Sequence, residues 1–281
     1  MPGTLSLVST PIGNLEDVTA RAARVLREAD AVLCEDTRHS RRLLDHVGST
    51  APTMALHEHN EARATEGLVR RLLDGAHLAL VSDAGTPLLS DPGARLVRAA
   101  LDAGVTVTPV PGPSALLAAL VAAGLDATRF TFYGFLARKG RERREALADL
   151  ATLRHTAVLY EAPGRAAETL AELAAACGGE RPAALARELT KQFEEVRRGT
   201  LTELAAYYAE RPPRGEVVLV LGGAPSAAPV ADPETLRERA RALYAEGRTA
   251  RDVARALEGE FGVGRNEAYR VAQESAGPAE G

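Results

Sequence analysis

Apolar and polar positions follow a regular pattern along the first 123 residues of the chain. Short apolar runs that each end in a polar turn predict strands, and apolar residues three or four positions apart predict helices. The predicted strands cover residues 5–9, 31–34, 77–81 and 105–110, and the predicted helices cover residues 17–28, 40–46, 63–74 and 115–123. This alternation of strand and helix predicts an α/β fold with a mostly parallel sheet.

A second α/β pattern follows Gly124, and a helical pattern ends the chain. Strands are predicted at residues 130–135, 156–160, 182–188 and 216–221, and helices at residues 143–153, 166–177 and 202–208. Residues 222–233 contain three prolines and have the composition of a linker. Helices at residues 234–246, 249–261 and 264–274 predict a small module like a helix-turn-helix. We therefore expect domains at residues 1–122, 123–225 and 232–275.

Two polar turns follow predicted strands in the first domain, at residues 82–93 and 111–114. We expect the two strands to be neighbours, which would bring both turns to the edge of a parallel sheet where ligands usually bind. Ordinary connecting loops, with Ser114 as a helix N-cap, are the alternative. The serine, threonine and aspartate residues of the two turns together favour a small-molecule site.

Composition and charge exclude several classes of protein. The chain has 281 residues, a net charge of −4 and no apolar run of the length that a membrane span needs, and its start lacks a signal-peptide pattern. We therefore expect a cytoplasmic protein without a membrane contact. The two cysteines, Cys34 and Cys177, suggest neither a disulfide nor a zinc site, and no phosphate-binding glycine motif of a dinucleotide or nucleoside triphosphate site is present. Contact with nucleic acid would have to come from local basic patches.

Four motifs carry a resemblance to a known family: STPIGNL at residues 9–15, followed by DVT at residues 17–19, EDTR at residues 35–38, SDAGTP at residues 82–87 and YEAPGR at residues 160–165. Over residues 4–275 the chain resembles the small-subunit ribosomal RNA (cytidine-2′-O-)-methyltransferases of the tetrapyrrole methylase superfamily. The resemblance implies a two-domain tetrapyrrole-methylase-like α/β fold with a small C-terminal helical module, S-adenosyl-L-methionine between the domains, a homodimer and no metal. It implies methylation of the ribose 2′-oxygen of cytidine 1402 in 16S rRNA, with the 30S ribosomal subunit as partner.

The same resemblance places the cofactor between the two α/β domains. The implied contacts of the first domain are Ile12, Thr86, Leu89, Ser114 and Ala115, and those of the second are Tyr160, Leu189 and Val217. Asp83 is interpreted as a loop organiser or an RNA-side residue.

Methyl transfer to a ribose hydroxyl needs alignment of the reacting atoms and gains from a nearby base. Glu35, Asp36 and Arg38 end a predicted strand and could supply the base or orient it, although a carboxylate that pairs with Arg38 and caps the next helix fits equally well. Glu188 and Lys191 form a second candidate cluster, in which the lysine could lower the pKa of the hydroxyl or simply form a salt bridge. His57 and His59 could be a base, RNA ligands or plain surface histidines.

The densest basic run is the candidate RNA contact. Arg138, Lys139, Arg141 and Arg144 could bind phosphates, and Tyr133 and Phe135 could stack on a base or pack in the core. The helical module has eight arginines against nine acidic residues between residues 232 and 274, so packing, a dimer contact and RNA contact all remain open for it. Methylation of a tetrapyrrole such as a corrin precursor, and a non-catalytic ribosome-associated protein, are the alternative functions.

Overall fold

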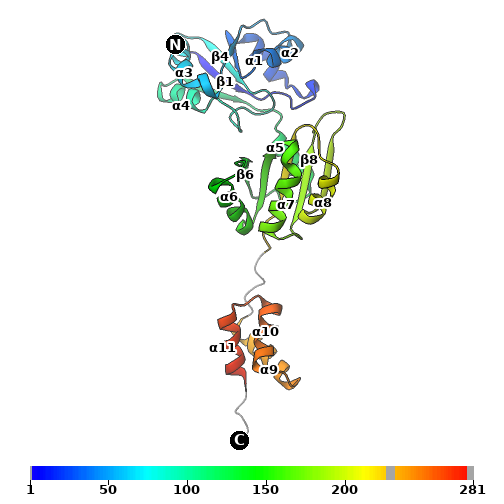
Figure 1. Cartoon of the computed structure of the whole chain (residues 1–281). Coiled ribbons are helices and arrows are strands. Elements are labelled where there is room, and N and C mark those ends of the chain that lie inside the picture. Colours follow the sequence, from blue (N-terminus) through cyan, green and yellow to red (C-terminus); the bar gives the residue numbers. More distant parts are fainter. Residues whose placement is uncertain (1, 226–231, 277–281) are drawn as a thin grey trace. The chain divides into compact units, whose positions relative to one another are not determined.

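The computed structural model describes residues 2–225 and 232–276. The chain forms two units, Met1–Gly223 and Ala224–Gly281 (Figure 1). The first unit contains two five-stranded sheets, and the second is helical. The predicted α/β fold with a small C-terminal helical module is confirmed. No helix of the described residues is long and apolar enough to cross a membrane.

The first sheet is parallel throughout and has the strand order β3-β2-β4-β1-β5. Its strands are β1 (Thr4–Val8), β2 (Ala31–Cys34), β3 (Thr53–Ala55), β4 (His77–Val81) and β5 (Thr106–Val110). The prediction that β4 and β5 are neighbours is wrong, because β1 lies between them and pairs with both. The loops after β4 and β5 therefore flank the loop after β1.

Helices cover both faces of the first sheet because its strands are apolar on both sides. The elements are the 3-10 turn η1 (Leu15–Asp17) and the helices α1 (Ala20–Glu28), α2 (Thr37–Val47), α3 (Glu58–Leu73) and α4 (Ala94–Asp102). Leu26 and Leu44 pack with Val8 and Val32 on one face, and α3 and α4 contribute to a second core on the other. Helix α2 begins three residues earlier than predicted because Asp36 caps it.

The second sheet has the order β6-β7-β10-β8-β9 and is mixed: β6 and β7 are parallel, and the other pairs are antiparallel. Its strands are β6 (Phe130–Phe135), β7 (Thr156–Glu161), β8 (Pro182–Arg187), β9 (Glu195–Thr200) and β10 (Val217–Leu221). Strand β9 was not predicted. Its sequence, EVRRGT, has no apolar run, and it lies at the sheet edge, where polar residues are tolerated.

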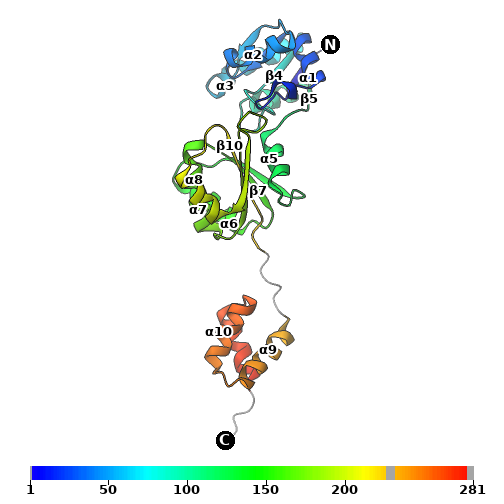
Figure 2. The same ribbon diagram turned by 90° about the vertical axis from the view of Figure 1, so that its right-hand side faces the viewer.

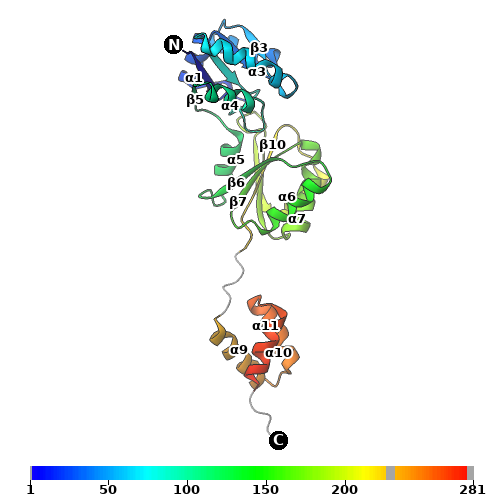
Figure 3. The same cartoon turned by 90° about the vertical axis from the view of Figure 1, so that its left-hand side faces the viewer.

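Two helical layers enclose the second sheet (Figures 2 and 3). On one face lie α6 (Arg141–Thr152), the turn η2 (Pro163–Arg165), α7 (Ala166–Cys177) and α8 (Leu201–Glu210). Helix α5 (Ala115–Ala123) covers the other face, where Leu116 and Leu120 pack with Val218 and Val220 of β10. The domain boundaries at residues 122 and 225 stay predictions. Because α5 packs on the second sheet, the structure favours a boundary between the two α/β domains that lies before Ala115.

The C-terminal unit contains α9 (Pro233–Ala245), α10 (Ala250–Phe261) and α11 (Arg265–Ser275). Its helices form a core of their own around Leu243, Leu257 and Val271. The three predicted helices are confirmed, and each end agrees to within one residue. The predicted linker overlaps residues 226–231, which lie outside the described residues.

Candidate active site

The loops that follow β1, β4 and β5 are tied together at one edge of the first sheet. Thr10 and Gly85 form a two-way backbone bridge, with N···O distances of 2.8 and 3.1 Å. The Thr86 hydroxyl lies 3.1 Å from the Ser9 hydroxyl and donates to the Pro113 carbonyl at 3.1 Å. Thr86 therefore links three loops and fixes their positions relative to one another at this edge of the sheet.

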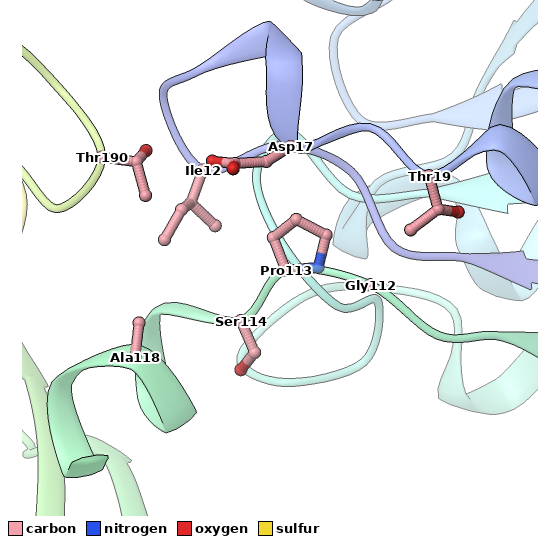
Figure 4. A pocket seen from close by; sticks show the side chains of 8 residues that line it. All are labelled: Ile12, Asp17, Thr19, Gly112, Pro113, Ser114, Ala118 and Thr190. Atoms are coloured by element: carbon pink, nitrogen blue, oxygen red, sulfur yellow. The ribbon is translucent and has the colours of Figure 1, made fainter. Parts of the chain in front are cut away.

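A cavity of about 370 Å³ opens between the loops after β1 and β5, helix α5 and the loop after β8 (Figure 4). It is lined by Ile12, Asp17, Thr19, Gly112, Pro113, Ser114, Ala118 and Thr190. Asp17 Oδ2, Ser114 Oγ and Thr190 Oγ1 are buried and have no hydrogen-bond partner among the described residues. A buried polar atom without a partner is costly, so three of them around one cavity indicate a place for a polar ligand.

The predicted cofactor contacts gather beside this cavity, with one exception. Ile12, Leu89, Ala115, Tyr160 and Leu189 belong to a single apolar cluster under α5. Val217 does not, because its side chain packs in the core on the opposite face of the second sheet, while its neighbour Val218 faces the cluster. Alternation along β10 explains the difference, since successive side chains point to opposite faces. The side chain of Val217 is thus not placed as predicted.

A second cavity of about 490 Å³ brings the sequence motifs together. Its lining comes from the loops after β1 and β4, from helix α2, from the loop after β8 and from the residue before β10: Thr10, Pro11, Ile12, Gly13, Leu15, Arg38, His39, Ser40, Arg42, Leu43, Ser82, Asp83, Ala84, Lys191 and Glu216. Arg38 and Lys191 are the predicted catalytic residues that reach it. Asp83 accepts from the Asp36 amide at 3.4 Å, in keeping with a role in loop organisation.

Lys191 is held between two carboxylates. Its Nζ lies 3.0 Å from Glu188 Oε1 and 3.3 Å from Glu216 Oε2, and its side chain is 26% exposed. Burial by itself would lower the pKa of Lys191, but the two carboxylates outweigh burial and raise this pKa. Burial would likewise raise the pKa of Glu188, and Lys191 brings it below its usual value. The group at the cavity is therefore a fixed ammonium ion and cannot act as a base.

Two loops near this site carry unusual backbone conformations. Leu88 and Ser90 follow β4, Glu188 and Thr190 follow β8, and all four have φ between 50° and 73°. They are the only non-glycine residues of the described ranges with positive φ. Such conformations cost energy and concentrate at ligand sites, so they support a functional role for both loops.

Asp36 serves chiefly as a helix cap. Its Oδ1 accepts from the Arg38 amide at 2.8 Å and from the His39 amide at 3.4 Å, and these backbone bonds, the first above all, lower its pKa. Arg38 lies 3.7 Å away as an ion pair with a side chain that is 93% exposed. Glu35 is exposed at the end of β2. The capping alternative therefore describes Asp36, whereas Arg38 and Glu35 remain free to meet a ligand.

Asp91 is a candidate that the sequence analysis missed. It lies in the loop between β4 and α4, where burial, followed by the charges of Glu35 and Asp83, raises its pKa to about 6. A carboxylate with such a pKa can exchange protons near neutral pH. Its position in the Ser-Asp-Pro-Gly turn is the sequence feature that could have identified it. The sequence places this turn at the predicted ligand edge, but Asp91 itself received no role.

The predicted RNA contacts are exposed and lie at the start of α6. Arg138, Lys139, Arg141 and Arg144 all face solvent, while Arg143 of the same run is buried and bonds to Thr169 and Glu172. Tyr133 packs against the core and donates to Asp149, so it does not present its ring. Phe135 is 58% exposed. His57 occupies the N-cap position of α3, where its amide donates to Asn60 Oδ1, and His59 is exposed; neither lines a cavity described above.

Comparison with known proteins agrees with this architecture. The chain matches the Tetrapyrrole (Corrin/Porphyrin) Methylases over residues 4–205 and belongs to this family. It is therefore an S-adenosyl-L-methionine-dependent methyltransferase, which confirms the expected enzyme class and cofactor.

Within the family, the curated relatives are proteins named ribosomal RNA small subunit methyltransferase I. The protein of that name from Synechocystis is 45% identical over 97% of this chain and 98% of its own length. The one from Xylella fastidiosa is 53% identical over 79% of this chain and 82% of its own length. These relatives confirm the resemblance that the four motifs carry.

Solved structures show the same fold. Uroporphyrin-III-C-methyltransferase from Thermus thermophilus matches 78% of this chain and 94% of its own, with a TM-score of 0.57 and 25% identity. A structure of that enzyme with S-adenosyl homocysteine has a TM-score of 0.58, 24% identity and coverage of 78% and 97%. Diphthine synthase has a TM-score of 0.64 at 17% identity, with coverage of 79% and 90%.

Proposed function

We propose that this methyltransferase methylates the ribose 2′-oxygen of a cytidine in 16S rRNA, at position 1402. The observation that carries the proposal is similarity over 97% of the chain to a protein named ribosomal RNA small subunit methyltransferase I. The 30S ribosomal subunit is then the partner, the cytoplasm is the location, and a homodimer is the form in which the protein acts.

The cavity beside Ile12 fits the cofactor. Ser114, Thr190 and Asp17 place unpartnered oxygens there, and Ile12 and Ala118 provide apolar contact. A ligand with polar groups and an apolar body, such as S-adenosyl-L-methionine, would satisfy both kinds of surface. When bound, it supplies a methyl group that a positive sulfur already activates. The contribution of the protein is to hold the acceptor in line and to exclude water.

The second cavity is suited to the acceptor. The Lys191 ammonium ion, fixed by Glu188 and Glu216, would favour the ionised form of a hydroxyl placed beside it. Arg38 at the same cavity can contact a phosphate through its forked donors. Glu35 can accept a proton, and Asp36 positions Arg38 by capping α2. Arg138, Lys139, Arg141 and Arg144 would add contacts to the RNA backbone.

The test is methylation of 30S subunits that lack the modification, with labelled cofactor and mapping of the methylated nucleotide. We expect one labelled ribose, at cytidine 1402, and a loss of about 10²-fold or more in rate for Lys191→Ala with unchanged cofactor affinity. Arg98→Ala, which removes an exposed cation from α4, serves as the matched surface control. Label elsewhere in the rRNA would refute the assigned position. Label in a corrin precursor but not in 30S subunits would assign the enzyme to tetrapyrrole chemistry.

A further inference from the structure

A third cavity, of about 190 Å³, lies outside the two cavities of the candidate active site. It is formed where β8, β9, the end of α8 and the segment before β10 meet, and its lining is Arg187, Glu195, Tyr207, Tyr208, Arg211, Pro212, Pro213 and Arg214. Strands β8 and β9 pair at one edge of the second sheet, and Figure 1 shows α8 near β8. None of the assigned roles uses this cavity.

Tyr208 gives the first sign of an occupant. Its side chain is 1% exposed, and its hydroxyl has no hydrogen-bond partner among the described residues. Burial, more than the nearby charge of Glu195, raises the pKa of Tyr208 to about 12, so the hydroxyl keeps its proton. A buried O–H without an acceptor is unfavourable. The cavity therefore lacks an acceptor at this point.

The charges that line the cavity point to an anion. The lining includes three guanidinium groups, those of Arg187, Arg211 and Arg214, and one carboxylate, that of Glu195. Arg211 also pairs with Glu210 outside the cavity, at 3.0 Å. Glu195 already accepts from Arg187 at 2.7 Å and from Arg197 at 3.4 Å, so its oxygens are engaged. Arg214 is exposed and forms no ion pair within the described part of the chain. The excess of donors matches a phosphate group, which offers only acceptors when ionised.

An aromatic contact holds one of these guanidinium groups, that of Arg211, in place. The Cζ atom of Arg211 lies 5.0 Å from the centroid of the Tyr207 ring, and that of Arg197, which does not line the cavity, lies 3.5 Å from it. Tyr208 meets the same ring edge-on, with centroids 5.0 Å apart. Cation–π contacts of this kind limit the motion of an arginine before a ligand arrives. The site is thus partly organised in the absence of its ligand.

We propose that this cavity binds a phosphate group of the RNA substrate. This proposal rests on the proposed function and on the short stretches of sequence that connect this cavity with the Lys191 site. Arg187 directly precedes Glu188, and Arg214 lies two residues before Glu216, whose amide donates to Glu188 Oε1 at 3.2 Å. Both carboxylates hold Lys191. A phosphate in this cavity would anchor the RNA backbone beside the loops that carry the acceptor site.

The first experiment uses inorganic phosphate as the probe. Thermal unfolding of the full chain is followed in sodium phosphate and in sodium chloride of equal ionic strength. Phosphate should stabilise the wild type, and Arg214→Gln and Tyr208→Phe should lose most of that gain. Tyr208→Phe keeps the ring and removes only the unpartnered hydroxyl, so it should fold and should be no less stable in chloride. Arg70→Gln, an exposed arginine of α3, is the matched control and should behave as the wild type.

The second experiment measures methylation of 30S subunits by the same variants. Arg214→Gln should raise the KM for the subunit about tenfold and lower the salt slope of binding by about one, with unchanged cofactor affinity. Equal stabilisation of the wild type and both variants by phosphate would show that this cavity does not bind phosphate. Lost stabilisation with an unchanged KM would overturn the RNA assignment and leave a free phosphate as the occupant. If the wild type methylates no subunit, the proposed function and the RNA assignment fail together. The phosphate titration contains no RNA, so it still shows whether the cavity binds phosphate.

Discussion

Single residues at the sheet edge divide into those that hold the loops and those that remain available to a ligand. Thr86 and Asp36 use their oxygens on neighbouring loops and on a helix end. Ser114 and Thr190 have oxygens without hydrogen-bond partners in the part of the chain that the structure describes, and Lys191 lines a cavity. A sequence names all of these as polar loop residues. Only the pattern of satisfied and unsatisfied hydrogen bonds separates their roles.

Asp91 yields a prediction on pH dependence. Because its pKa is raised to about 6 in the folded protein, the folded state favours protonated Asp91 more than the unfolded chain does. The wild type therefore loses stability from this group as the pH rises between about 4 and 6. Asp91→Asn should remove that loss and raise the free energy of unfolding by on the order of 1 kcal/mol at pH 8 and by little at pH 4. This figure is discounted because Asp91 is partly exposed.

Urea unfolding across this pH range measures the effect of Asp91. Glu66→Gln, on the exposed face of α3, provides the control and should give the same small difference at every pH. A difference between Asp91→Asn and the wild type that does not vary with pH would show that Asp91 titrates normally.

At the scale of elements, the apolar pattern was sufficient to predict where several buried strands and helices begin and end. Strands β2, β4 and β6 and helices α5 and α7 begin and end where the pattern predicted. Strand order and β9 could not be predicted, because pairing depends on contacts far apart in sequence and an edge strand needs no apolar run. The orientation of Val217 was missed for a related reason, since a fully buried strand is apolar on both faces.

The loops after β1 and β8 meet at Gly13 and Lys191. A Cβ at residue 13 would lie 2.7 Å from Lys191 Cε, so only glycine leaves room for the lysine stem. Gly13→Ala should displace Lys191 from Glu188 and Glu216 and reduce methyl transfer at least about tenfold. The measurement is single-turnover methylation beside thermal unfolding, and the activity should fall more than the stability.

The matched variant for Gly13→Ala is Gly67→Ala. Gly67 lies within α3, and no other atom would come within 4 Å of an added Cβ. This variant should keep full activity and gain slightly in stability, because alanine is the better helix former. Wild-type activity in Gly13→Ala would show that the position of Lys191 is unimportant.

At the scale of the whole molecule, the chain carries two independently cored units. The helical unit is small, and small cores give little stability, so it depends strongly on each buried leucine. Leu257 is fully buried there, and Leu257→Ala should cost about 2–5 kcal/mol. We expect calorimetric scanning to show an earlier transition for this unit, with unchanged cofactor affinity. A weaker affinity would mean that the helical unit supports the cofactor site.

The placement of β1 between β4 and β5 has a consequence for synthesis of the protein. Leu5 pairs with Leu78 and Val107, so β1 leaves the ribosome well before either of its partner strands has been made. Thr190 then completes the cavity that begins at Ile12. With the methyl donor in the cavity proposed for it, a nascent chain could gain stability from the donor only after Thr190 has been made, when most of the first unit is present.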